Sequence, residues 1–165
     1  MVPSPSEPLQ EPAKLQLNRR FQPCAAEPGD ELYPNGIFEF NVTRLLAFIR
    51  AHAERFPIEL VELTEMPDFG HGEHLNAAAI FASDLSRPIL LAEITPSRYN
   101  VIDGHHRLAR ARREGLRRMP VHRVPCPEHL AFLTSARAYE KYVEYWNSKL
   151  ALLQRSVRRV RLRNG

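Results

Sequence analysis

Hydrophobic residues recur every three or four positions in two long parts of the chain, which predicts two amphipathic helices. The first follows Asn41 and Thr43, either of which can cap a helix N-terminus, and Pro57 is expected to end it. Its buried face comprises Leu45, Leu46, Ile49, Ala53 and Phe56. The second stripe, near the C-terminus, comprises Tyr139, Tyr142, Val143, Trp146, Leu150 and Leu153. Two shorter segments, 75–85 and 105–114, are rich in good helix formers and are also expected to be helical.

Alternating or continuous apolar runs between these segments predict β-strands. The runs lie at residues 37–40, 58–63, 88–94, 99–102 and 120–124. A turn at 95–98 is expected to join two of them into a hairpin. Helices and strands are mixed along the chain. The pattern therefore predicts an α+β fold with a small mixed sheet, packed helices and a C-terminal helical extension.

Composition divides the chain into four parts. Residues 1–28 hold six prolines and few large apolar groups, which indicates a leader that is poorly ordered or wraps around the surface. Residues 29–126 form the predicted domain. Residues 127–154 are expected to form a helical extension packed on it, and residues 155–165 an arginine-rich tail.

The overall composition limits the class of protein. With 44% hydrophobic and 25% charged residues, the chain is typical of a globular domain rather than a disordered one. It has no run of about 18 apolar residues and no basic start followed by an apolar run, so neither a membrane span nor a secretory signal is predicted. Cys24 and Cys126 alone do not indicate a disulfide framework, and we expect a cytoplasmic protein.

Positive charge is concentrated at the C-terminus. The net charge is +4, and five of the 23 basic residues fall within the last eleven, which contain no acidic residue. The rest of the chain holds 18 basic and 19 acidic side chains and is nearly neutral. Such a tail is typical either of a segment that binds an acidic partner or nucleic acid, or of a solvated chain end.

One short motif combines the residue types that bind phosphate. Asp103-Gly104-His105-His106-Arg107 lies between a predicted strand and a predicted helix. N–H groups in the first turn of a helix lack partners within it, and the helix dipole favours negative charge there. A glycine before the helix lets a phosphate approach the backbone, and an arginine can bind two phosphate oxygens. The same residues also suit a simple turn in which Asp103 caps the helix and Arg107 forms an ion pair.

Residues 99–111, followed by Gly115 and Met119-Pro120-Val121, resemble the core of the ParB/sulfiredoxin superfamily. The resemblance implies a small α+β domain that binds a nucleotide at residues 103–107, with ATP, ADP or CTP and Mg²⁺ as the expected ligands. Sulfiredoxins carry a catalytic cysteine where this chain has His105, so sulfinic acid reduction is not expected. Partition proteins carry a glutamate there and continue into a helix-turn-helix and a dimer domain. Because only residues 125–165 follow Val124 here, a full partition protein is not expected either.

The Asp-Gly and His-Arg pairs of the motif resemble the free-serine kinases most, in which an aspartate and a separate glutamate support phosphoryl transfer. Asp103 matches the aspartate, and Glu31 and Glu39 are the candidates for the glutamate. The leading hypothesis is a small-molecule phosphotransferase. Asp103 and His106 have catalytic roles in it, and the residues expected to bind phosphate are Gly104, His105, His106, Arg107 and Arg110.

Two alternatives involve other residues. In the first alternative, the chain is a non-catalytic module that binds nucleic acid or a protein through its basic residues. These residues are Arg110, Arg113, Arg117 and the arginines of residues 155–163. The loop at 68–74 contains Asp68, His71, Glu73 and His74. The sequence leaves three interpretations of these side chains open: they are exposed to solvent in a loop, they bind a metal ion, or they line the nucleotide pocket. Their spacing matches no established zinc motif, so no metal site is predicted.

Overall fold

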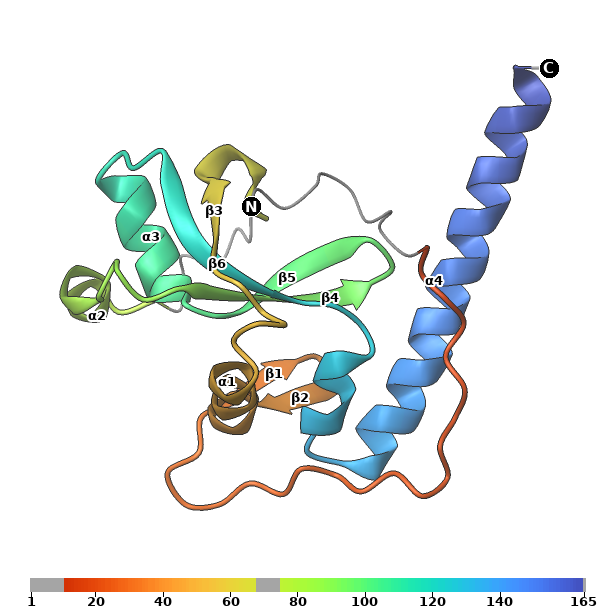
Figure 1. The fold of residues 1–165 in the computed structure, drawn as a ribbon, viewed down its shortest axis with the longest axis horizontal. Coiled ribbons are helices and arrows are strands. Elements are labelled where there is room, and N and C mark those ends of the chain that lie inside the picture. Colours follow the sequence, from red (N-terminus) through yellow and green to blue (C-terminus); the bar gives the residue numbers. More distant parts are fainter. Residues whose placement is uncertain (1–10, 68–74, 165) are drawn as a thin grey trace.

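The computed structural model describes residues 11–67 and 75–164. It contains a four-stranded sheet in the order β3-β6-β4-β5, a separate two-stranded hairpin β1-β2, and α-helices and short 3₁₀ helices around them (Figure 1). The elements are β1 (Leu32–Asn35), β2 (Phe38–Asn41), α1 (Val42–Ala51), β3 (Glu59–Glu62), η1 (Leu63–Glu65), α2 (Ala77–Ala82), β4 (Ile89–Thr95), β5 (Arg98–Asp103), α3 (His105–Arg113), β6 (Arg118–Val124), η3 (Glu128–Phe132) and α4 (Ala136–Arg163). The predicted α+β class is confirmed.

The central sheet is mixed and buried on both faces. β4 pairs with β5 in the expected antiparallel hairpin and with β6 in parallel, while β3 is antiparallel to β6. Leu90 and Ala92 face a core shared with α1, β2 and α4, whereas Ile89 and Leu91 face a second core closed by α3. This position between two cores explains why β4 reads as a continuous apolar run rather than as an alternating one.

Two predicted helices are shorter than the sequence pattern suggested. α1 ends at Ala51 and not at Pro57, because the backbone of His52 leaves the helical range, with φ of −128° and ψ of 44°. The His52 ring nitrogen Nδ1 lies 2.9 Å from the Phe48 carbonyl at this end of the helix. α2 ends at Ala82, and the next residues form a turn in which Asp84 accepts bonds from Ser86. Short polar side chains of this kind compete with helical backbone bonds and favour turns.

Residues 11–28 follow the surface of the domain, first along α4 and then across its base toward α1 (Figure 1). Trp146 donates from Nε1 to the Ala13 carbonyl at 2.9 Å, and Asn147 exchanges two hydrogen bonds with the backbone of Leu15. The ring of Phe21 stacks on Tyr139 with centroids 4.0 Å apart. Of the two arrangements expected for the leader, the described part follows the surface of the domain.

α4 is a single helix of 28 residues, with no break at residue 154. Its first half packs on the domain through the predicted stripe, of which Tyr142 and Trp146 are almost fully buried. Its second half, including the arginine-rich segment, continues as helix because it contains no glycine or proline and is rich in good helix formers. No helix in the described ranges has the length and hydropathy needed to cross a membrane.

The start of α1 depends on Asn41, and its loss is expected to destabilise the fold. Asn41 is fully buried; its Oδ1 accepts from the Arg44 N–H at 3.1 Å and its Nδ2 donates to Asp30 at 2.8 Å. Asn41→Ala should therefore lower the free energy of unfolding in urea by about 2 kcal/mol. Asn76→Ala, at the exposed cap of α2, is the matched control and should cost under about 1 kcal/mol. Equal losses in the two variants would contradict a special role for the buried cap.

Candidate functional site

The predicted phosphate-binding motif forms a tight connection between β5 and α3. Gly104 is the residue before the helix and has a left-handed backbone, with φ of +100° and ψ of 20°. A Cβ atom at this position would lie 2.9 Å from Nη2 of Arg107 and 3.1 Å from Cγ1 of Ile89. Glycine is therefore required both by the backbone angle and by the space beneath it. The first N–H groups of α3 follow directly, in the orientation that favours anions.

Arg107 holds this turn from beneath. Its residue surface is 8% exposed, and its Nη2 donates to Asp103 Oδ2 and to the Pro88 carbonyl, both at 3.0 Å. Its Nε is buried and has no hydrogen-bond partner among the described residues. The guanidinium thus ties the end of β5, the start of β4 and α3 together, and its positive charge lies directly under Gly104.

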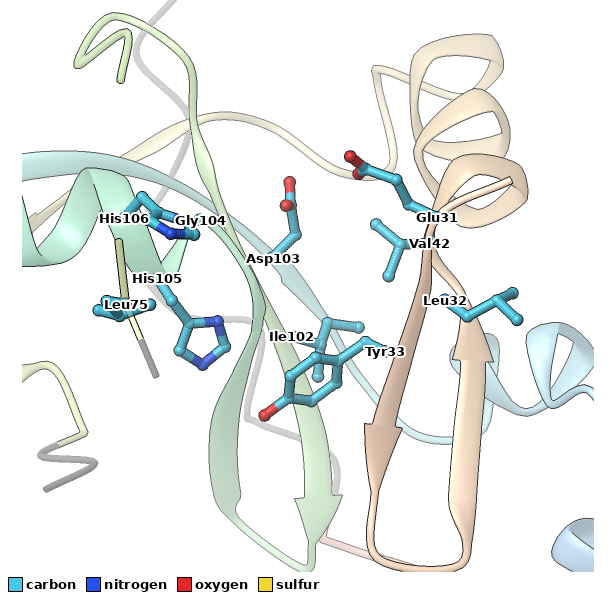
Figure 2. A pocket seen from close by; sticks show the side chains of 10 residues that line it. All are labelled: Glu31, Leu32, Tyr33, Val42, Leu75, Ile102, Asp103, Gly104, His105 and His106. Carbon is cyan, nitrogen blue, oxygen red and sulfur yellow. The ribbon is translucent and has the colours of Figure 1, made fainter. Parts of the chain in front are cut away.

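Glu31 is brought to the motif from a distant part of the sequence. Its N–H donates to Thr43 Oγ1 at 2.8 Å and its carbonyl accepts from the Val42 N–H at 2.9 Å, so its backbone is fixed by the start of α1. Its carboxylate and that of Asp103 point into the same part of a pocket from β1 and from the end of β5 (Figure 2). Two carboxylates therefore face a common space beside the N-terminus of α3.

Two adjoining cavities meet at these carboxylates. They share Glu31, Asp103, Gly104 and His106, and their volumes are about 490 and 370 Å³. The larger cavity is completed by mostly apolar and aromatic side chains, which are Leu32, Tyr33, Val42, Leu75, Ile102 and His105. The smaller is completed by small and charged residues, which are Ala79, Ala82, Ser83, Asp84, Arg87 and Arg107. The site thus has one apolar side and one charged side.

Tyr33 and His105 form the aromatic wall of the larger cavity. Their rings stack with centroids 5.3 Å apart and planes inclined by 24° (Figure 2). Burial raises the pKa of the Tyr33 hydroxyl, so the phenol stays neutral at physiological pH. A flat ligand group can pack against such a pair.

Asp84 and Arg87 line the smaller cavity. The hydroxyl and N–H of Ser86 donate to Asp84 and hold the pKa of its carboxyl below the ordinary value, and Arg87 and Arg107 add to this effect. Asp84 is therefore a carboxylate at neutral pH. The Arg87 side chain is exposed beside it and is available to an anion entering this cavity.

Several predicted site residues come together and others do not. Asp103, Gly104, His106 and Glu31 line both cavities, and His105 and Arg107 each line one. Glu39 lies elsewhere, where its Oε1 accepts from the Thr134 hydroxyl at 2.7 Å. Arg110 lines neither cavity; its Nε donates to Glu114 at 2.8 Å, and its Nη1 donates to the carbonyl of Ser83, a residue that lines the smaller cavity. Asp68, His71, Glu73 and His74 lie outside the described residues.

Tyr33, Asp84 and Arg87 were not predicted as site residues. Asp84 two positions before Ser86 is a recognisable turn signal, but it does not reveal that the turn lies beside residues 103–107. Tyr33 directly precedes Pro34-Asn35-Gly36, which is also a turn signal, but that signal does not reveal that the Tyr33 ring lies against His105. Both assignments depend on contacts between segments that are far apart in the sequence.

No protein-family model, curated protein or solved structure matches this chain. Within residues 11–67 and 75–164, no group of three or more histidine, cysteine, aspartate or glutamate side chains is placed to hold a metal ion. The function is therefore inferred from the geometry of the two cavities and the groups between them.

Proposed function

We propose that the chain binds a nucleotide at residues 103–107 and transfers its terminal phosphoryl group to a small hydroxyl compound. The observation that carries this proposal is the position of Glu31 and Asp103 where a charged and an apolar cavity meet. A phosphoryl transfer needs a phosphate donor and an acceptor on either side of the reacting group, with a carboxylate near the attacking hydroxyl. The two cavities provide space for both reactants.

The phosphates would lie at the start of α3. The first N–H groups of the helix, the His106 ring and the Arg87 guanidinium supply hydrogen-bond donors around this point. The base of the nucleotide or the acceptor would pack on Tyr33 and His105. A Mg²⁺ ion arriving with the nucleotide would neutralise phosphate charge, and Glu31 and Asp103 have the carboxylate oxygens suited to hold it.

In the transfer step, Glu31 or Asp103 accepts the proton of the acceptor hydroxyl. The hydroxyl oxygen forms a bond to phosphorus as the bond to the leaving nucleoside diphosphate breaks. Positioning and charge stabilisation would supply most of the rate, with general-base action contributing about 10²- to 10⁴-fold.

Calorimetric titration with ATP, ADP and CTP, each with and without Mg²⁺, tests the binding step. We expect micromolar binding of at least one nucleotide. Arg87→Gln and His106→Gln should each weaken it about tenfold, because each removes one hydrogen bond to a charged phosphate. Arg98→Gln, an equal change of charge in the exposed β4–β5 turn, is the control and should bind normally.

Arg107→Ala is a poor choice for this test, because the side chain supports the turn itself. Its removal would leave Asp103 without its partner and open a space beneath Gly104. Absence of binding by all three nucleotides, in protein shown to be folded, would overturn the proposal. Unchanged nucleotide affinity in both Arg87→Gln and His106→Gln would show that the phosphates do not bind at the N-terminus of α3.

A further inference from the structure

The second half of α4 extends beyond the domain and carries a concentrated positive charge (Figure 1). Residues 151–163 are all exposed along this segment. It contains five arginines, which are Arg155, Arg158, Arg159, Arg161 and Arg163, and no acidic residue follows Glu144. At a rise of about 1.5 Å per residue, the segment is about 20 Å long.

These arginines differ from several basic residues in and after α3, in the region that the sequence had suggested as a binding patch. Arg110 is paired with Glu114, and Arg117 and Arg118 both bond to Glu62, at 3.1 and 2.7 Å. In contrast, no acidic side chain in residues 11–67 or 75–164 forms an ion pair with any of the five arginines of α4. Three of the basic residues in and after α3 are therefore paired within the domain, whereas the arginines at the end of α4 remain available to a partner.

The arginines surround the helix rather than forming a single row. With 3.6 residues per turn, they span about 200° of its circumference. The apolar residues Leu153 and Val157 lie on the remaining side, where they line a groove with Glu11 and Pro12 of the leader. Arg158 and Arg161 border this groove, and the arc of arginines continues from there around the exposed side of the helix.

The shape of this charged arc discriminates among anionic partners. A partner helix contacts one strip of α4 and would leave most of the arginines unused. A flat lipid surface needs its cations on one side, and Leu152 and Leu162, which are 53% and 83% exposed, lie among the arginines. The major groove of B-form DNA, about 12 Å wide, admits an α-helix and has phosphates along both of its walls. Only this partner can contact arginines on both sides of the helix at once.

We propose that the second half of α4 binds a DNA duplex through its phosphates, largely independently of base sequence. The inference goes beyond the proposed transfer of phosphate and does not depend on it, since these arginines lie outside the two cavities. Up to five phosphate contacts predict a slope of about −4.5 in log affinity against log salt. Affinity should then fall about 500-fold between 50 and 200 mM salt.

Fluorescence anisotropy with a labelled 20-base-pair DNA duplex provides the test on the full chain. Arg158→Gln, Arg159→Gln and Arg161→Gln together should reduce the slope to about −1.8 and the salt-dependent loss to about 12-fold. The matched control removes the same charge from the first half of α4 through Arg137→Gln, Lys141→Gln and Lys149→Gln, and should keep the parent slope. Circular dichroism establishes that both triple variants retain the helix.

Two further probes separate the other partners. Vesicles with about 30% anionic lipid and a poly-glutamate peptide are titrated under the same salt conditions. Weaker binding of both probes than of the duplex supports the proposal. Failure to bind the duplex at 50 mM salt, a parent-like slope in the arginine variant, or tighter binding of vesicles or peptide overturns it.

Discussion

Acidification from about pH 6.5 to about pH 4 is expected to lower the free energy of unfolding by about 3 kcal/mol through His129 alone. His129 lies in η3 and is fully buried, with its ring edge-on to Phe40 and Tyr142 at centroid distances of 5.6 and 5.5 Å. Its Nε2 lies 2.6 Å from the Glu93 carbonyl, and its Nδ1 has no hydrogen-bond partner among the described residues. Burial lowers the pKa of this imidazole to about 4, and the bond to the Glu93 carbonyl only partly opposes the effect.

The direction of the effect follows from the two protonation states. The unfolded chain takes up a proton at this histidine as the pH falls through about 6.5, whereas the folded chain stays neutral there until about pH 4. Between these values the unfolded state binds more protons, so stability falls with pH. Above about pH 6.5 both states are neutral and His129 contributes no pH dependence.

Replacement of His129 by leucine isolates this contribution. The Tyr142 hydroxyl, which lies 3.0 Å from the Glu93 carbonyl and 2.8 Å from that of Ile94, can donate its one proton to either of them in the variant. Urea denaturation at intervals from pH 7 to pH 4.5 should therefore show a steep loss of stability in the parent and a much flatter profile in His129→Leu. His52→Leu, at a half-buried position, is the control and should keep the parent profile. A parent-like profile in His129→Leu would show that other groups cause the acid sensitivity.

The sequence predicted the local features of this site better than its long-range ones. Gly104 between an apolar run and a helix-forming segment is a local signal, and the structure has the turn where it was expected. Asn41 as a helix cap is a second such signal. In both cases the deciding hydrogen bonds or backbone angles involve residues only a few positions apart.

The choice between Glu31 and Glu39 could not be made from the sequence. Glu31 directly precedes β1 and Glu39 lies in β2, and the sequence contains no signal for which of them approaches β5. The structure places Glu31 beside Asp103 and binds Glu39 to Thr134, so that the paired residues are 72 and 95 positions apart. Arg107 is a similar case, because its buried orientation depends on the carbonyl of Pro88, just before β4. The burial of His129 likewise has no local signal.

Loss of the two carboxylates at the junction of the cavities is expected to have the largest effect on catalysis. Glu31→Gln should reduce phosphoryl transfer, measured as release of nucleoside diphosphate from ATP or CTP in the presence of free serine, by about 10²- to 10⁴-fold. Glutamine keeps the size and hydrogen bonding of the side chain but cannot accept the proton. Because Glu31 is exposed and its structural bonds involve only its backbone, the fold should be unaffected.

Asp103→Asn should reduce the rate of phosphoryl transfer by a factor of the same order as Glu31→Gln, and it should also lower the free energy of unfolding. The side chains of Asp103 and Arg107 are 19% and 10% exposed, so the variant leaves a largely buried guanidinium without its counter-charge. Stability in urea is therefore measured alongside turnover for this variant. Nucleotide affinity should change far less than turnover in Glu31→Gln, since the phosphates would be held mainly by α3.

Glu39→Gln is the matched control, because it makes the same substitution on the other side of the β1-β2 hairpin. Its bond with the Thr134 hydroxyl survives the change, and its turnover should equal that of the parent. Full activity in both Glu31→Gln and Asp103→Asn would show that the two carboxylates take no part in the reaction. Residues 103–107 would then be a binding site without a catalytic role. A loss in Glu39→Gln equal to that in Glu31→Gln would instead indicate that the hairpin as a whole, rather than the carboxylate facing Asp103, supports the reaction.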